Sequence, residues 1–341
     1  MSERDRLVDA RDRMARAAGQ DDPSAVRLLR EAIDLDPSLR EAYGALGRLY
    51  YRNAWLEAEL DLWLQRIGVD PMDADAHERI GWILWFTGRA EESLPWLERN
   101  LTLRPSGKWG RFYMGNAHLI LGRYVEAERA YRAAIEAHPD FSSAHAGLAW
   151  TLFAAGRVGE ARAQCDRMRA TTLDGDRYEV KMADLDLFSG EATTAAERAR
   201  RVSPEDARAW PARYWPRGTS ATTILAGALI DRDYRAAAAA LTVSESVNRS
   251  RLLNGDEGYL PRYDLAAVYA LYGNRDEACR WLTEAIAVGW WFPDLARRDP
   301  LLRSLHECPP FEDLLKKRPA PHGRRPLPRC PSGAAARGPG D

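Results

Sequence analysis

The stretch LGRYVEAERAYRAAIEAHP (residues 121–139) has the pattern of one amphipathic helix that begins after a glycine turn and ends at a proline. Two similar stretches flank it, TGRAEESLPWLERNLTLRP (87–105) before it and AGRVGEARAQCDRMRATTL (155–173) after it. Each has a Gly-Arg turn followed by a Glu/Ala-rich helix, and the starts at 87, 121 and 155 are 34 apart. The constant interval predicts an array of equal structural units.

Each unit contains two helices, and two adjacent positions recur on the first of them. A large apolar residue is followed directly by a small one, and these pairs are Leu46-Gly47, Ile80-Gly81, Met114-Gly115 and Leu148-Ala149. The small residue lets the first helix approach its neighbour closely. Pro71, Pro105 and Pro139 recur at the same interval and are expected to end the second helix of their units.

Residues 108–141 fit this pattern best, with Met114-Gly115, Gly122, Tyr124, Ala127, Tyr131, Ala134 and Pro139. The pattern resembles the tetratricopeptide-repeat (TPR) family, whose unit is a helix-turn-helix. The resemblance covers about residues 4–318 and includes a second clear unit at 260–288. It implies an all-α, right-handed superhelix (an α-solenoid) whose first helices line a concave groove.

Three prolines in SPEDARAWPARYWPRGTS (203–220) break the repeat register and predict a joint. We therefore expect an N-terminal repeat array (1–205), an irregular joint (206–220), a C-terminal repeat block with capping helices (221–318) and a disordered Pro/Gly/Arg-rich tail (319–341). The capping segment resembles the closing element of TPR blocks in bacterial multidomain regulators.

Charge and composition limit the classes of partner. The chain has 49 basic and 50 acidic residues and a net charge of −1, so no overall field favours nucleic acid, and only the basic tail offers a route to it. The charged start lacks a signal peptide, and no apolar run is long enough to span a membrane. The four cysteines form no C-x-x-C pair, which favours reduced thiols and a cytoplasmic protein.

Signatures of catalysis are not found in the sequence. It has no phosphate-binding loop, no nucleophile elbow, no H-E-x-x-H and no dinucleotide fingerprint. His77 and His145 are two repeats apart and fall at an inter-helix packing position, where a structural role is expected. The sequence therefore predicts a non-catalytic protein without a metal or another cofactor.

The binding hypothesis rests on a third stripe of side chains on the first helices. Equivalent positions of successive units stack in columns, so these side chains line up along the array. The candidate groove residues are Arg48, Tyr51, Arg52, Glu78, Trp82, Trp85, Trp109, Phe112, Asn116, Trp150 and Phe153. Rigid aromatic rings dominate binding hot spots, and Arg48, Arg52, Arg79 and Asn116 would orient a bound peptide or partner helix by hydrogen bonds.

Several alternatives stay open. The aromatic rings would also be explained if neighbouring first helices buried them against one another, or if the C-terminal block folded into the groove. A regulatory or sensor component of a bacterial signalling or transcription-control system is a second hypothesis for function. An enzyme with a site at the 203–220 joint, around Asp206, Trp210, Tyr214 and Trp215, is a third.

Overall fold

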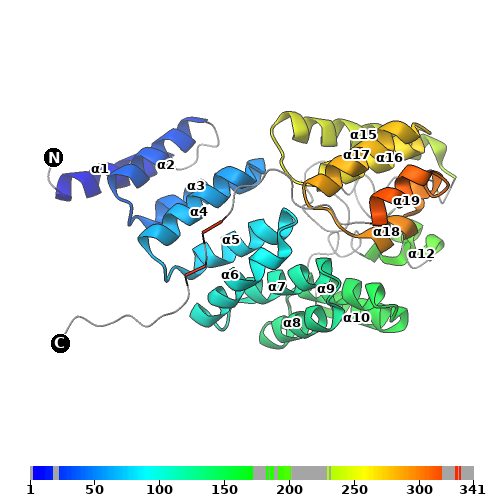
Figure 1. The fold of residues 1–341 in the computed structure, drawn as a ribbon, viewed down its shortest axis with the longest axis horizontal. Coiled ribbons are helices and arrows are strands. Elements are labelled where there is room, and N and C mark those ends of the chain that lie inside the picture. The colour runs from blue at the N-terminus through cyan, green and yellow to red at the C-terminus, as the bar shows by residue number, and fades with distance from the viewer. Residues whose placement is uncertain are drawn as a thin grey trace.

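Helix pairs at a constant interval build the N-terminal array in the computed structural model (Figure 1). The first helices are α3 (Arg40–Asn53), α5 (Ala74–Phe86), α7 (Lys108–Ile120) and α9 (Ser142–Ala154), which begin at residues 40, 74, 108 and 142 and are thus 34 apart. The second helices are α4 (Leu56–Val69), α6 (Ala90–Leu103), α8 (Tyr124–Ala137) and α10 (Val158–Thr171), at the same interval. An earlier pair, α1 (Glu3–Ala17) and α2 (Pro23–Leu35), precedes them. The all-α repeat fold predicted from the sequence is confirmed.

The structure describes residues 3–17, 23–171, 182–183, 185–187, 191–199, 201, 229, 232–316, 327–328 and 330–331. The joint expected at 206–220 lies outside these residues, as does most of the tail expected at 319–341. The enzyme hypothesis, which depends on Asp206, Trp210, Tyr214 and Trp215, falls on the same undescribed segment.

The recurring small residue brings the two helices of a unit together. A Cβ atom added to Gly81 would lie 2.5 Å from the side chain of Leu97, and one added to Gly47 would lie 2.7 Å from the ring of Trp63. Tyr131 is fully buried between Gly115 of its own unit and Gly147 of the next unit, because a Cβ at either glycine would lie within 2.7 Å of its ring. Because glycine has no Cβ at these positions, large side chains of the second helices pack directly against the backbone of the first helices.

The turns inside the units share one backbone conformation. Gly88, Gly122 and Gly156, at intervals of 34, have φ values of 82°, 73° and 80°. Ala54 occupies the same register position and has φ 55°. Positive φ is easy for glycine and costly for other residues, which explains why the Gly-Arg turn recurs.

The C-terminal helices return beside the array (Figure 1). They are α15 (Tyr234–Leu253), α16 (Leu260–Leu271), α17 (Arg275–Ala287), α18 (Pro293–Arg298), the 3-10 helix η1 (Pro300–Leu305) and α19 (Pro309–Lys316), with α12 (Ala192–Ala199) between the array and this block. In η1 and α19, apolar side chains that are at most 3% exposed cover the end of the block; these are Leu301, Leu302, Leu305, Phe311 and Leu315.

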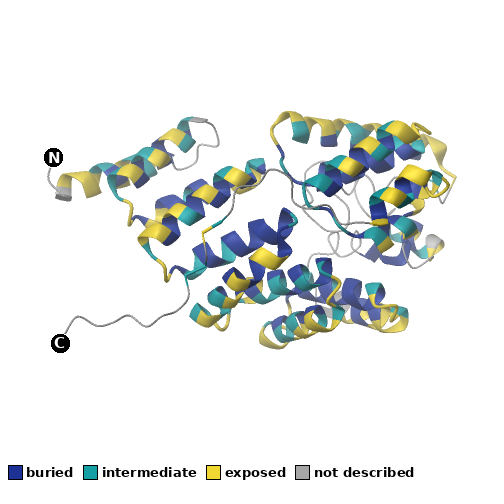
Figure 2. Ribbon diagram, in the orientation of Figure 1, coloured by how far each residue is buried: buried dark blue, intermediate teal, exposed yellow. Residues whose placement is uncertain are grey.

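Most buried apolar side chains form one core that runs from Ala10 in α1 to Leu315 in α19, and a small second cluster holds Ala237 and Ala240 of α15. Figure 2 shows buried segments on the helices of the array and of the C-terminal block. None of the helices in the described part of the chain has both the length and the apolarity needed to cross a membrane. The core is shared by the array and the C-terminal block, so the two pack as neighbours.

Candidate functional site

The first helices α3, α5, α7 and α9 carry all the side chains of the predicted groove, and the structure divides these into two groups. We call the first group the open end; it holds Arg48, Tyr51, Arg52, Glu78, Trp82, Trp109, Phe112 and Asn116. The second group, the covered end, holds Trp85, Trp150 and Phe153. Trp82 and Trp85 are about equally buried, so the division follows from the exposed rings of Tyr51 and Trp109 at one end and from Arg298 against Phe153 at the other.

At the open end two large apolar side chains reach solvent. Tyr51 is 36% exposed and Trp109 is 39% exposed. Arg48 and Arg52 are also exposed, whereas Glu78, Phe112 and Asn116 are half-buried. Trp82, only 5% exposed, lies beneath them, with its ring 5.2 Å from that of Tyr51. These side chains form a wall of aromatic and polar groups along α3, α5 and α7.

At the covered end the predicted aromatic wall is inside the core. Trp85, Trp150 and Phe153 are 6%, 3% and 2% exposed. The guanidinium of Arg298, in α18, lies 4.9 Å from the centre of the Phe153 ring. Phe153 thus lies against the C-terminal block, whereas the ring of Trp85 contacts Phe86 and Tyr113 of the array and that of Trp150 contacts Phe153.

The C-terminal block contacts the turns of successive units. The ring of Phe86, at the end of α5, lies 4.9 Å from that of Tyr259, and Gly88 touches the backbone of Gly289. Further along, the turn between α7 and α8 and the segment 291–295 enclose a cavity of about 270 Å³, lined by Tyr124, Trp291 and other residues. The block thus lies along one edge of the array.

Hydrogen bonds also join the turn between α3 and α4 to the C-terminal block. The Trp55 indole N–H donates to the Asn254 carbonyl (3.3 Å), and the backbone N–H of Glu57 donates to the Glu257 carboxylate (2.9 Å). In return, the Glu257 N–H donates to the carbonyl of Ala54 (3.3 Å). Segments far apart in the sequence are thereby joined at the turn between α3 and α4.

Arg79, expected to orient a bound peptide, instead serves the array itself. Its guanidinium binds the carboxylate of the fully buried Glu59 on α4, with Nε 3.0 Å from Oε1. The same group lies over the rings of Tyr51 (4.9 Å) and Trp82 (4.4 Å). The Asn116 side-chain oxygen likewise accepts a hydrogen bond from the Tyr131 hydroxyl. Both polar groups therefore hold neighbouring rings in place.

Glu78 is the acidic group of the open end. Burial raises the pKa of its carboxyl to about 7, against the opposing effect of Arg104 and Arg79. Tyr113, one residue beyond the predicted Phe112, lies near Glu78, because the charges of Glu78 and Arg79 both act on the pKa of its hydroxyl. Burial raises that pKa far above its ordinary value. Sequence reasoning missed Tyr113, although it occupies the same repeat position as Arg79, one unit later, and so shares its column.

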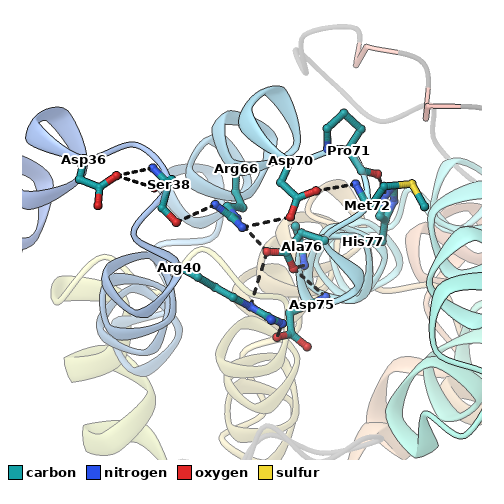
Figure 3. Close-up of polar contacts among 11 residues, drawn as sticks. Asp36, Ser38, Arg40, Arg66, Asp70, Pro71, Met72, Asp75, Ala76 and His77 are labelled. Atoms are coloured by element: carbon teal, nitrogen blue, oxygen red, sulfur yellow. Dashed lines mark hydrogen bonds and ion pairs between the residues drawn. The ribbon is translucent and has the colours of Figure 1, made fainter. Parts of the chain in front are cut away.

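A buried polar network fixes the start of α5 and hence the position of Glu78 and Trp82 (Figure 3). Arg66 Nε donates to the Asp73 carboxylate at 2.7 Å, and the other Asp73 oxygen accepts from the N–H groups of Asp75 and Ala76 at 3.0 and 3.1 Å. Burial raises the pKa of Asp73, but the hydrogen bonds from Arg66 and Ala76 lower it more, so it lies below its ordinary value.

The two register-related histidines have structural roles. His77 is fully buried, and its Nε2 lies 3.0 Å from the carbonyl oxygen of Pro71. His145 Nε2 makes the same contact with the carbonyl of Pro139 at 2.8 Å. Each histidine thus ties a first helix to the proline turn that precedes it. In the part of the chain that the structure describes, no three His, Cys, Asp or Glu side chains are placed to hold a metal ion.

Comparison with known proteins identifies the repeat. Models of the tetratricopeptide repeat match residues 114–174 and 260–284. A search of curated protein sequences found no match.

Solved structures with the same kind of fold include MamA, with 18% identity over 50% of this chain and 91% of its own and a TM-score of 0.43. MamA from Desulfovibrio magneticus RS-1 has 16% identity over 49% of this chain and 95% of its own, with a TM-score of 0.45. PilW, described as a widely conserved type IV pilus biogenesis factor, has 21% identity over 58% of this chain and 91% of its own, with a TM-score of 0.48.

Proposed function

We propose that the chain, which tetratricopeptide-repeat models match at residues 114–174 and 260–284, is a non-catalytic interaction scaffold that binds a peptide or a partner helix at the open end of its groove. Helical repeats of this kind present an extended concave surface, and a helix or an extended segment fits such a surface. The partner would lie across α3, α5 and α7.

One observation carries the proposal: Tyr51 and Trp109 are 36% and 39% exposed, whereas Trp85, Trp150 and Phe153 are covered. Large rings that stay exposed beside a buried aromatic floor are typical of binding hot spots. Arg48 and Arg52, also exposed on α3, would form the polar rim.

We place the protein in the cytoplasm, since all four cysteines, Cys165, Cys279, Cys308 and Cys330, are free thiols. Unpaired thiols are usual in a reducing compartment. The partner would then be a cytoplasmic protein.

Capture from a lysate with matched variants tests the proposal. The test variant is Tyr51→Ser/Trp109→Ser in the full chain, and the control is Val125→Ser/Tyr234→Ser, which removes two apolar side chains that are 67% and 69% exposed outside the groove. We expect proteins that bind the wild type and the control to be lost from the groove variant, with unchanged circular dichroism. Retention of the same proteins by all three forms would place binding elsewhere.

A further inference from the structure

Glu78 on α5 and Tyr113 on α7 are polar groups of the open end that no other side chain satisfies. Glu78 is half-buried and Tyr113 is 8% exposed. Within the described part of the chain, neither the Glu78 carboxyl nor the Tyr113 hydroxyl has a hydrogen-bond partner or an ion pair. Neither group is among the fully buried polar atoms without a partner, so the carboxyl and the hydroxyl reach the surface and keep hydrogen-bonding capacity that a ligand can use.

The cations closest to Glu78 are already paired. Arg79 binds Glu59 on α4, and Arg104 binds Asp75, with Nη2 2.6 Å from Oδ1. Both arginines influence the Glu78 carboxyl from a distance, yet neither forms an ion pair with it. The carboxyl therefore lies in a partly dehydrated place that lacks a direct counter-ion.

Aromatic rings line the same place. The ring of Trp109 stacks on that of Tyr113, with centroids 5.7 Å apart, and Phe112 lies 5.6 Å from Tyr113. Trp109 keeps 39% of its surface exposed, so a planar group can still approach it. A carboxyl, a hydroxyl and an exposed indole together match an arginine side chain, which donates several hydrogen bonds and stacks on aromatic rings.

We propose that Glu78 and Tyr113 bind a cationic side chain of the partner, an arginine in preference to a lysine, with the cation seated beside Trp109. This inference rests on the proposed function and adds the chemistry of the partner to it. Glu78 would accept hydrogen bonds from the guanidinium, and the Tyr113 oxygen would accept another.

The site predicts that binding depends on pH. The charged and titratable groups that act on Glu78 are Asp75 and Arg79 on α5 and Arg104 after α6. Tyr113 on α7 is influenced by Glu78 and Arg79, and also by Tyr51 on α3 and Glu59 on α4. With the Glu78 pKa at about 7, the carboxyl is largely protonated at pH 6 and must lose a proton to receive a cation. Affinity should therefore rise about tenfold from pH 6 to pH 8.

A random peptide library displayed against the full-length protein supplies the probes. Enriched peptides are synthesised with each arginine either kept or replaced by citrulline, which has nearly the same shape without the charge. Binding is measured at pH 6 and pH 8 to the wild type, to Tyr51→Ser/Trp109→Ser, to Glu78→Gln, to Tyr113→Phe and to Glu136→Gln. Glu136 is an exposed glutamate on α8 and serves as the control.

We expect enriched peptides to contain a basic residue and to lose at least tenfold in affinity with citrulline. Glu78→Gln should abolish both the preference for arginine and the pH dependence, Tyr113→Phe should weaken binding several-fold, and Glu136→Gln should change nothing. Peptides that need Tyr51 and Trp109 but bind equally well with citrulline would overturn this inference and leave the proposed function standing. If no enriched peptide needs Tyr51 or Trp109, both fail.

Discussion

At the scale of single residues, the Glu78 carboxyl makes stability depend on pH. Its pKa of about 7 in the folded protein exceeds the ordinary value of 4.5, so folding favours the protonated form. Stability should therefore fall as pH rises from about 4.5 to 7. Glu78→Gln removes this loss. We expect the free energy of unfolding of the variant, measured against the wild type at the same pH, to be about 1–3 kcal/mol higher at pH 8 than at pH 5.

Urea denaturation of both proteins at the two pH values measures the difference. A gain of the same size at pH 5 and pH 8 would show that Glu78 has an ordinary pKa. Glu136→Gln, on the surface of α8, is the control and should show no pH-dependent gain.

The turn glycines give a second prediction at this scale. Gly122 has φ 73°, and a Cβ added there would meet no atom within 4 Å, so Gly122→Ala isolates the backbone strain. We expect a loss of about 1 kcal/mol in the free energy of unfolding. Gly159→Ala, inside α10 and equally uncrowded, should instead be neutral or stabilising because alanine favours the helix. Equal effects of the two substitutions would contradict the role given to positive φ.

At the scale of helices, the Glu59–Arg79 pair joins α4 to α5. Glu59 is fully buried, so Glu59→Gln leaves the Arg79 guanidinium without its counter-ion. We expect a loss of about 3 kcal/mol in the free energy of unfolding, measured by urea denaturation. A loss below about 1 kcal/mol would mean that the pair is hydrated and contributes like a surface ion pair.

The helices could be predicted from the sequence because the repeat is a local signal. The constant repeat interval placed the turns at Gly88, Gly122 and Gly156 and the helix ends before the prolines. Partners within the array were harder to predict, since they depend on how each helix is rotated about its axis. Arg79 could equally have faced the groove or α4, and only the packing of α4 on α5 places it on Glu59.

At the scale of the whole molecule, the covered end results from contacts between segments far apart in the chain. Ala54 and Glu257 are hydrogen-bonded, and Phe86 contacts Tyr259. The repeat interval carries no information on such contacts, because the register is broken between the array and the C-terminal block. The sequence therefore predicted the aromatic column but not the contact between Phe153 and Arg298 of the C-terminal block.

Gly88→Ala tests the attachment of that block. It introduces the same strain as Gly122→Ala, but its Cβ would also lie 2.4 Å from the Cα of Gly289. We expect faster hydrogen exchange at residues 258–263 in Gly88→Ala than in Gly122→Ala. Equal exchange in the two variants would show that the contact with Gly289 does not hold the block.

The central claim is that a partner binds the open end while the covered end stays closed. Hydroxyl-radical footprinting of the full chain, with and without a partner captured by the wild type, tests it most directly. In the free protein Tyr51 and Trp109 should react readily, and Trp85 and Trp150 should be protected. The partner should protect Tyr51 and Trp109 and leave Tyr234, on α15, unchanged. Unchanged reactivity at Tyr51 and Trp109 in the complex, or new reactivity at Trp85 and Trp150, would contradict the claim.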